Sequence, residues 1–541
     1  MTRVLKVMTQ GCVHGELDRA FEIAKKHRGI DLILINGDFQ AVRNDTDLRC
    51  MSVPPKYLKR GDFRKYYIGP RAAPVLTIVI GGNHEASNHM TELFYGGWLA
   101  KNIYYLGAAG VVNFKGLRIG GISGIWQPEH YRLGHGELVN QFQGNAMRSA
   151  YHTRQFEVMK LLLIKDRMDL FMAHDWPQGI AHFGDLKQLL EEKPFLKTDI
   201  KTGKLGNPAH RLLLEHLKPS LWLGSHMHVR FTAEFPHNDP SIRFSQNPNE
   251  IELPSGAYVR SDTADTTTKF LALDKCLPRR KFSEILTVEC PDYDKHYKTH
   301  SKSAKVSKEM QKRNPTIVRR EMASSIGRSD FESKIVRSKK LFYDTEWLAI
   351  TKTMNEYLSL SMDPQLLPDT NSAEFKSKLE QNKEWVVANI VEKGRLGVIS
   401  YRDQLMPQGK GVFPAVKKGR NINKVHKKIV YDYIDNELQV FNRSLQTEMF
   451  CRQLDMENKF APYYQFDTVP LDVIPPYIES QDRERSESEV EEHLVGENED
   501  IDVDVDAATA EYSDSSDVSN LDILEFESDD ESFDEPLTET K

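Results

Sequence analysis

Short apolar runs alternate with polar loops along the first 275 residues. Each run is rich in large or β-branched apolar residues and ends abruptly in Gly, Asn, Asp or His. Continuous apolar runs of this length are typical of strands buried within a sheet. The pattern predicts five such strands, at residues 4–8, 31–36, 75–80, 169–173 and 221–224.

Helical periodicity appears between these runs. Leu17, Ala20, Phe21 and Ala24 have the spacing of one apolar helix face. Residues 147–165 and 209–217 predict two more helices, and residues 119–122, 231–235 and 270–273 predict antiparallel strands. The alternation indicates an α/β protein, so we expect two facing mixed β-sheets flanked by helices.

Acidic and basic residues are unevenly distributed along the chain. The 541 residues include 72 Lys and Arg against 79 Asp and Glu, a net charge of −7, but residues 481–541 alone carry 24 acidic and 3 basic residues. Such a segment cannot bury enough apolar surface to fold, so we expect residues 479–541 to be a disordered acidic tail. It is either a solubilising extension or an arm for unidentified protein partners.

The remainder is basic, which favours a polyanionic partner. Residues 56–71 (KYLKRGDFRKYYIGPR) interleave six basic residues with four aromatic ones. Lys56 and Tyr57 in this stretch are candidate RNA contacts, although a solvated amphipathic element has the same pattern. The basic runs 279–281 and 417–428 are either nuclear-import signals, nucleic-acid contacts or solvated surface.

The organisation changes beyond residue 275. Residues 1–275 are the expected catalytic domain, 276–340 a basic linker, and 341–478 a smaller C-terminal region. Helical periodicity marks residues 341–358 and 375–391, and residues 425–441 predict a further helix or strand pair, but no chemistry can be assigned to this region. No run approaches the roughly 18 apolar residues of a membrane span. Five scattered Cys and no apolar leader favour an intracellular protein.

Residues suited to metal binding follow the five predicted strands. A His after a strand is often only structural, but here every strand is followed by such residues. Side chains two apart on extended backbone point the same way, and the carboxyl ends of strands are where sites form in open α/β sheets. The candidates are Cys12, His14, Asp38, Asn83, His84, His174, His226 and His228.

The donor types suit two first-row divalent ions, since imidazoles, an amide oxygen and a carboxylate able to bridge are all present. Two ions about 3.5–4 Å apart can hold a phosphate and generate a hydroxide near neutral pH. The sequence therefore predicts phosphoester hydrolysis.

The loops GDFQ, GGNHEASNH, HDWP and GSHMHV resemble the signature blocks of the calcineurin-like metallophosphoesterases, whose fold is an αββα sandwich. Within that superfamily, GCVHGELD, NGDFQAVRNDTDLRCM, VPPKY, YGGWLAKNIYYLG and GISGI are similar to the RNA lariat debranching family, over roughly the first 275 residues. The resemblance implies a metal-dependent phosphodiesterase that cuts the 2′–5′ bond at the branch of excised intron lariats. Branched lariat RNA would be the partner, in the nucleus, with shuttling to the cytoplasm left open.

The family pattern also implies residue roles. His84 would be the general acid that protonates the departing 2′-oxygen. Residues 124–154 match the position of the family's recognition loop, in which Trp126, Tyr131 and Arg132 suit stacking and phosphate contact, and a plain surface loop is the alternative. One ion would be held by Cys12, His14, Asp38 and His228, and a second by Asp38, Asn83, His174 and His226.

Two differences from the wider superfamily affect the expected metal and the expected substrate. Cys12 stands where most relatives have Asp, and sulfur favours Fe²⁺ or Zn²⁺, with Mn²⁺ also expected, over Mg²⁺. GDFQ lacks the longer motif of protein Ser/Thr phosphatases, which disfavours a phosphoprotein substrate. The alternatives are a broader nuclease or nucleotide phosphodiesterase of the same superfamily, and a non-catalytic scaffold with this fold.

Overall fold

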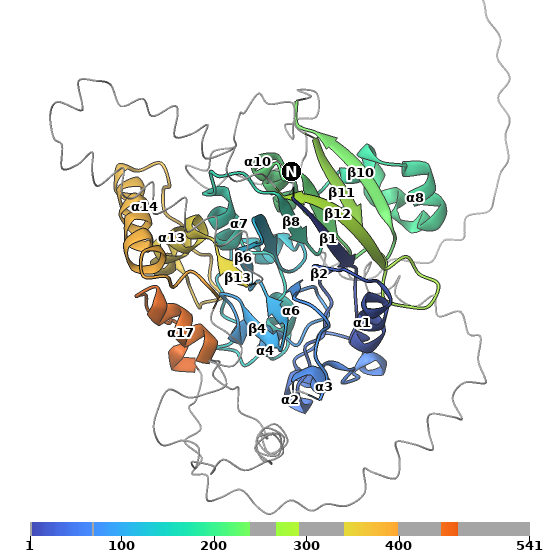
Figure 1. Cartoon of the computed structure of the whole chain (residues 1–541), viewed down its shortest axis with the longest axis horizontal. Coiled ribbons are helices and arrows are strands. Elements are labelled where there is room, and N and C mark those ends of the chain that lie inside the picture. Colours follow the sequence, from blue (N-terminus) through green and yellow to red (C-terminus); the bar gives the residue numbers. More distant parts are fainter. Residues whose placement is uncertain (1–2, 68–69, 239–266, 291–339, 399–444, 464–541) are drawn as a thin grey trace, which may run out of the picture. The chain divides into compact units, whose positions relative to one another are not determined.

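Two β-sheets pack face to face (Figure 1). The structure, a computed structural model, describes residues 3–67, 70–238, 267–290, 340–398 and 445–463. The first sheet has the order β12 (Ser283–Cys290), β1 (Arg3–Gln10), β2 (Leu32–Asn36), β3 (Thr77–Ile80), β5 (Ile103–Tyr105) and β4 (Gly97–Ala100). The second has the order β10 (Phe231–Pro236), β11 (Thr267–Ala272), β9 (Leu221–Gly224), β8 (Leu170–Ala173), β7 (Leu117–Ile122), β6 (Ala109–Phe114) and β13 (Leu341–Tyr343).

Parallel pairing joins the central strands of both sheets, and antiparallel pairing adds the outer ones. Successive side chains along a strand point to opposite faces of its sheet and so belong to two different cores. Val7 and Met172 belong to the apolar layer between the sheets, whereas Met8, on the other face of β1, packs with Phe21 of helix α1 (Leu17–Lys26). The expected pair of mixed sheets flanked by helices is therefore confirmed.

Helices cover the outer face of each sheet. Helices α1, α3 (Phe63–Tyr67) and α4 (Ser87–Glu92) share a core with the first sheet, and α7 (Gln155–Leu162) and α10 (Pro208–Leu217) share one with the second. Smaller elements are α2 (Asp45–Arg49), η1 (Pro55–Tyr57), α5 (Pro128–Tyr131), α6 (Asn145–Ser149), η2 (Ile180–Phe183), α8 (Leu186–Glu192), η3 (Pro194–Leu196) and α9 (Lys197–Lys201).

The single helix predicted at residues 147–165 is wrong. The segment forms α6 and α7, separated by buried backbone at His152 and Thr153. His152 forms a bridge with Ile125, and the Thr153 N–H donates to the Ile125 carbonyl at 2.8 Å. This tertiary pairing overrides the local helical periodicity.

The first sheet extends beyond residue 275, where we expected the linker to begin. Strand β12, inside the expected linker, pairs with β1 and completes the first sheet, while β13 pairs with β6 and completes the second. Residues 341–358 thus begin with a strand and continue as α13 (Thr345–Met354) and η6 (Asn355–Tyr357). Helix α14 (Ala373–Val386) with a π-helical turn (Val387–Val391), α17 (Leu445–Gln453) and η8 (Ala461–Tyr463) complete the C-terminal region.

Residues 417–428, 425–441 and 479–541, for which the sequence makes predictions, lie outside the described residues. All five cysteines are described, buried and free of disulfide bonds. In the described ranges, no helix has the length and apolar character needed to cross a bilayer.

Candidate metal centre

The carboxyl ends of five strands bring the candidate ligands together. Strands β1, β2 and β3 deliver residues from the first sheet, and β8 and β9 deliver residues from the second. The centre therefore lies where the two sheets meet, and neither sheet could build it alone. These residues are Cys12 and His14, Asp38, Asn83 and His84, His174, and His226 and His228, in strand order.

One group of four donors is especially compact. The ligand atoms of Cys12, His14, Asp38 and His228 all lie within 4.8 Å of one another. His14 Nε2 is 3.1 Å from His228 Nε2 and 3.7 Å from Asp38 Oδ2. Two imidazole nitrogens facing each other beside a carboxylate and a thiol form a set of donors that a borderline or soft divalent cation prefers.

A second group uses the other carboxylate oxygen. His174 Nε2 lies 3.4 Å from Asp38 Oδ1 and 3.2 Å from Asn83 Oδ1. The rings of His174 and His226 have centroids 5.1 Å apart. Asp38 thus offers one oxygen to each group, so its carboxylate could be shared by two ions.

Several of these residues have strained backbone. His14, Asp38, His226 and His228 have φ values of 48°, 48°, 62° and 49°, in the left-handed region that non-glycine residues avoid. Each costs on the order of 1–3 kcal/mol, and such conformations collect at functional sites. The strained backbone of these four residues lowers the stability of the fold and directs their side chains toward the centre.

Glycines leave room for the ligands. A Cβ on Gly82 would lie 2.2 Å from Asp38 Oδ1, and a Cβ on Gly37 would lie 2.2 Å from His174 Nδ1. A side chain at either position would therefore displace a candidate ligand.

Buried hydrogen bonds fix the ligand loops. His174 Nδ1 donates to the Asn36 carbonyl at 2.7 Å, which leaves Nε2 as the donor atom facing the centre. The Glu85 carboxylate accepts the backbone N–H groups of Phe39 at 2.7 Å and Gln40 at 2.8 Å. Glu85 therefore ties the loop after β3 to the loop that carries Asp38.

The electrostatics fit cation binding. Burial raises the pKa of Asp38, but the charges of His174 and His84 outweigh burial and hold this pKa well below its usual range. Burial and the neighbouring His174 lower the pKa of His226 to about 3, so its imidazole is neutral. Burial and the Asp38 charge raise the pKa of the Cys12 thiol well above its ordinary value. A cation would stabilise the thiolate and would also satisfy Asp38 Oδ2, which is buried without a hydrogen-bond partner among the described residues.

Comparisons with known proteins agree with this geometry. The family model described as calcineurin-like phosphoesterase matches residues 5–230, and that described as lariat debranching enzyme, C-terminal domain, matches residues 265–459. The lariat debranching enzyme of Schizosaccharomyces pombe is 35% identical over 453 residues, covering 73% of this chain and 88% of that relative. The chain belongs to the lariat debranching enzyme family.

Other members of the family match over part of their length. The lariat debranching enzyme of Gallus gallus is 42% identical over 377 residues, which cover 69% of this chain and 59% of the relative. That of Homo sapiens is 49% identical over 298 residues, which cover 53% of this chain and 51% of the relative. The chain thus spans about half to three-fifths of these two relatives. The resemblance inferred from motifs is confirmed, and membership of the metallophosphoesterases implies divalent metal ions.

The predicted RNA contacts have different environments. Lys56 is exposed on η1, with its Nζ 4.9 Å from the centroid of the Tyr57 ring. This stretch reaches the metal centre, because the Asp62 N–H donates to the Gly15 carbonyl at 2.9 Å. Both residues of the pair stay candidates for RNA contact.

Among the candidates in residues 124–154, Tyr131 is 4% exposed. Its ring packs against the partly exposed Trp126, with centroids 4.9 Å apart, so in this structure Tyr131 supports Trp126. Arg132 is exposed. Contact of these three residues with RNA stays a prediction.

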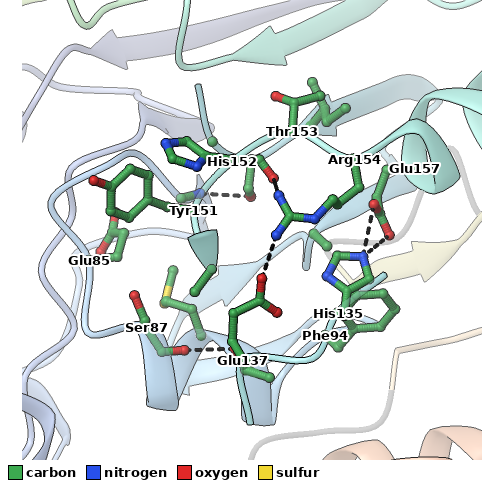
Figure 2. A pocket seen from close by; sticks show the side chains of 18 of the residues that line it. Glu85, Ser87, Phe94, His135, Glu137, Tyr151, His152, Thr153, Arg154 and Glu157 are labelled. Carbon is green, nitrogen blue, oxygen red and sulfur yellow. Dashed lines mark hydrogen bonds and ion pairs between the residues drawn. The ribbon is translucent and has the colours of Figure 1, made fainter. Parts of the chain in front are cut away.

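Sequence reasoning missed a pocket beside the ligand loops (Figure 2). It has a volume of about 60 Å³ and is lined by Gly82 and Glu85 on one side and by His135, Glu137 and Arg154 on the other. Arg154, 1% exposed, is paired with Glu137, and His135 Nε2 lies 3.1 Å from Glu157. The only signal for this pocket was the density of charged residues in 124–157, which says nothing about how they pair.

Proposed function

We propose that this chain is a metal-dependent RNA phosphodiesterase that hydrolyses the 2′–5′ bond at the branch point of lariat RNA and leaves linear RNA. The observation that carries the proposal is the group of four donors within 4.8 Å, with Asp38 shared by a second group. Relatives of this chain are described as lariat debranching enzymes, which supports the choice of substrate.

Two divalent ions fit the donors. Cys12, His14, Asp38 and His228 would hold one ion, and Asp38, Asn83, His174 and His226 the other. A thiol among neutral imidazoles favours Fe²⁺ or Zn²⁺, with Mn²⁺ next, over Mg²⁺. When bound, such ions neutralise phosphate charge and lower the pKa of a bound water.

His84 is the proposed general acid. Its backbone N–H donates to Asp38 Oδ1 at 2.9 Å, which fixes the residue beside the shared carboxylate. Its ring centroid is 5.4 Å from that of His14, and the side chain is only partly buried, so substrate can reach it. In this role His84 donates a proton to the departing 2′-oxygen, a contribution of about 10²–10⁴-fold in rate.

The test compares a synthetic RNA carrying one 2′–5′ branch with a linear RNA of the same sequence. We expect cleavage of the branched RNA alone. Equal cleavage of both would favour a broader nuclease, and cleavage of neither by metal-loaded protein would favour a scaffold.

His84→Ala tests the acid role. We expect the variant to keep its metal and to lose about 10²–10⁴-fold in turnover. His182→Ala is the matched control, because His182 is an exposed histidine away from the centre, on η2. Loss of metal in His84→Ala would contradict the assignment and make His84 a ligand.

We also propose a nuclear location, since intron lariats are produced there. The exposed basic run at residues 279–281 supports it. Imaging of the full chain with this run replaced by alanines tests the idea, and unchanged nuclear signal would remove the support.

A further inference from the structure

The C-terminal region contacts the segment that lines the pocket. Residues 359–365, called the brace below, run beside the loop formed by residues 132–137. The Gly134 N–H donates to the Asp363 carbonyl at 3.1 Å, the His135 N–H to the Ser359 carbonyl at 2.8 Å, and the Gln365 N–H to the Arg132 carbonyl at 2.7 Å. Three backbone hydrogen bonds thus join two segments more than 200 residues apart in the sequence.

The approach is close enough to require glycine. A Cβ on Gly134 would lie 2.5 Å from the Ser361 carbonyl oxygen, and a Cβ on Gly136 would lie 2.6 Å from the Met362 nitrogen. Both obstacles are backbone atoms, which cannot rotate away as a side chain could. The brace and the loop therefore have one relative position.

The brace is itself fixed at both ends. The Lys459 Nζ donates to the carbonyls of Glu356 at 2.7 Å and Leu358 at 2.8 Å, and the Gln365 Nε2 donates to the Tyr357 carbonyl at 2.5 Å. The brace is therefore held against the rest of the C-terminal region as well as against the loop.

The loop carries polar groups into the pocket. Figure 2 shows His135 directed toward Glu157 and Glu137 directed toward Arg154. The opposite side of this pocket is the loop of Gly82 and Glu85, which also carries Asn83 and His84. A group bound in the pocket would therefore lie next to the metal centre.

The beginning of the same segment is tied to the ligand loops. The Gly124 N–H donates to the Gly81 carbonyl at 3.0 Å, and the Trp126 N–H donates to Asp175 Oδ2 at 3.2 Å. Gly81 precedes the Asn83 loop, and Asp175 follows His174. One end of the segment is thus fixed to the metal centre, and the other is fixed by the brace.

We propose that the brace is a positioning element for substrate: it holds the 132–137 loop in the place from which the loop orients the RNA around the branch beside the metal centre. This gives the C-terminal region a part in substrate selection, and it rests on the proposed debranching function. The hydrogen bonds of the brace go to the 132–137 loop and to the C-terminal region, so we expect it to act on how RNA is held and not on the metal centre itself.

Two variants loosen the brace by different means. Gly134→Ala inserts a methyl group against the Ser361 carbonyl, and its control is Gly397→Ala, a glycine of the C-terminal region whose new Cβ would meet only the Phe342 ring, at 3.9 Å. Gln365→Pro removes the backbone N–H that donates to the Arg132 carbonyl. Its control is Gln365→Ala, which loses only the side-chain hydrogen bond to the Tyr357 carbonyl. Should Gly134→Ala fail to fold, the Gln365 pair carries the test.

Each full-length variant is assayed on the branched RNA and on bis(p-nitrophenyl) phosphate, a small diester that needs only the metal centre, and its metal content is measured. We expect Gly134→Ala and Gln365→Pro to lose about 10²-fold in kcat/KM on branched RNA, the effect of misplacing a substrate by about 1 Å. Metal content and hydrolysis of the small diester should stay at the wild-type level in every variant. On branched RNA, Gly397→Ala should match wild type, and Gln365→Ala, which keeps the backbone N–H, should lose less than Gln365→Pro.

Equal losses on both substrates, or no loss on branched RNA, would overturn the positioning role while leaving the debranching function intact. A wild-type protein that hydrolyses the small diester but not the branched RNA would overturn both proposals.

Discussion

Arg118 on β7 joins the second sheet to the C-terminal region through buried charges. Its guanidinium donates to Asp344 through Nε at 2.9 Å and Nη2 at 2.8 Å, and to Glu346 Oε2 at 2.9 Å. Asp344 also caps α13 by accepting the Trp347 N–H at 2.9 Å. All three charged side chains are at most 9% exposed.

Arg118→Met keeps most of the bulk but removes the charge. Two buried carboxylates then face each other without a cation, and breaking a buried pair in this way costs about 3–5 kcal/mol. Arg60→Met is the matched control, because Arg60 pairs with Asp45 at the surface, where both side chains are about half exposed. Exposed pairs are worth about 0–1 kcal/mol.

The measurement is the free energy of unfolding of the full chain in urea at pH 7, followed by tryptophan fluorescence. We expect Arg118→Met to lose several times more stability than Arg60→Met. Adding Asp344→Asn and Glu346→Gln to Arg118→Met should recover part of the loss, since Asn still caps a helix and neither amide carries charge. Equal losses in Arg118→Met and Arg60→Met would refute the reasoning.

The pH dependence has a defined sign. Burial opposes ionisation of Asp344, but Arg118 outweighs it and lowers the pKa of this carboxyl. A lowered folded-state pKa adds stability above the unfolded value of about 3.9, and this stability is lost as pH falls through the folded value. Glu346 differs, because burial outweighs Arg118 and raises its pKa. From the Asp344 contribution, we expect the difference in free energy of unfolding between wild type and Arg118→Met to be largest above about pH 5. This difference should decrease in acid.

Three substitutions test the metal centre by elemental analysis. Gly82→Ala should release metal, because its Cβ would lie 2.2 Å from Asp38 Oδ1, whereas Gly397→Ala, whose Cβ would meet only the Phe342 ring at 3.9 Å, should retain it; equal metal content in the two variants would contradict this. Asp38→Ala should release more metal than any other single ligand substitution, since both groups of donors share this residue, and full retention would show that Asp38 is not a ligand. Cys12→Ser should shift the preferred metal from Zn²⁺ toward Mn²⁺ or Mg²⁺, and an unchanged preference would exclude Cys12 from the inner ligands.

The strands that build the centre were predictable because each is a local signal. The run at residues 221–224 matches β9, and Leu17, Ala20, Phe21 and Ala24 are all buried on α1, as their spacing predicts. Convergence of the ligand loops followed from parallel pairing, which places carboxyl ends at one edge.

Contacts between distant segments were not predictable. Strand β12 has mixed burial, so its residues give little apolar signal, and its place beside β1 depends on pairing over the length of the catalytic domain. The brace has no periodicity, and its contact with Gly134 is carried by backbone atoms, which leave no trace in side-chain chemistry. The burial of Tyr131 likewise depends on how Trp126 packs over it.

The position of β1 between β2 and β12 has a consequence for biosynthesis. A ribosome adds about 5–20 residues per second, so the interval between synthesis of β1 and synthesis of its antiparallel neighbour β12 is on the order of tens of seconds. During that interval one edge of the nascent sheet has unpaired backbone N–H and C=O groups, which are open to pairing with other chains. Recovery of native protein should therefore depend on chaperone capacity during translation more than on the stability of the folded protein.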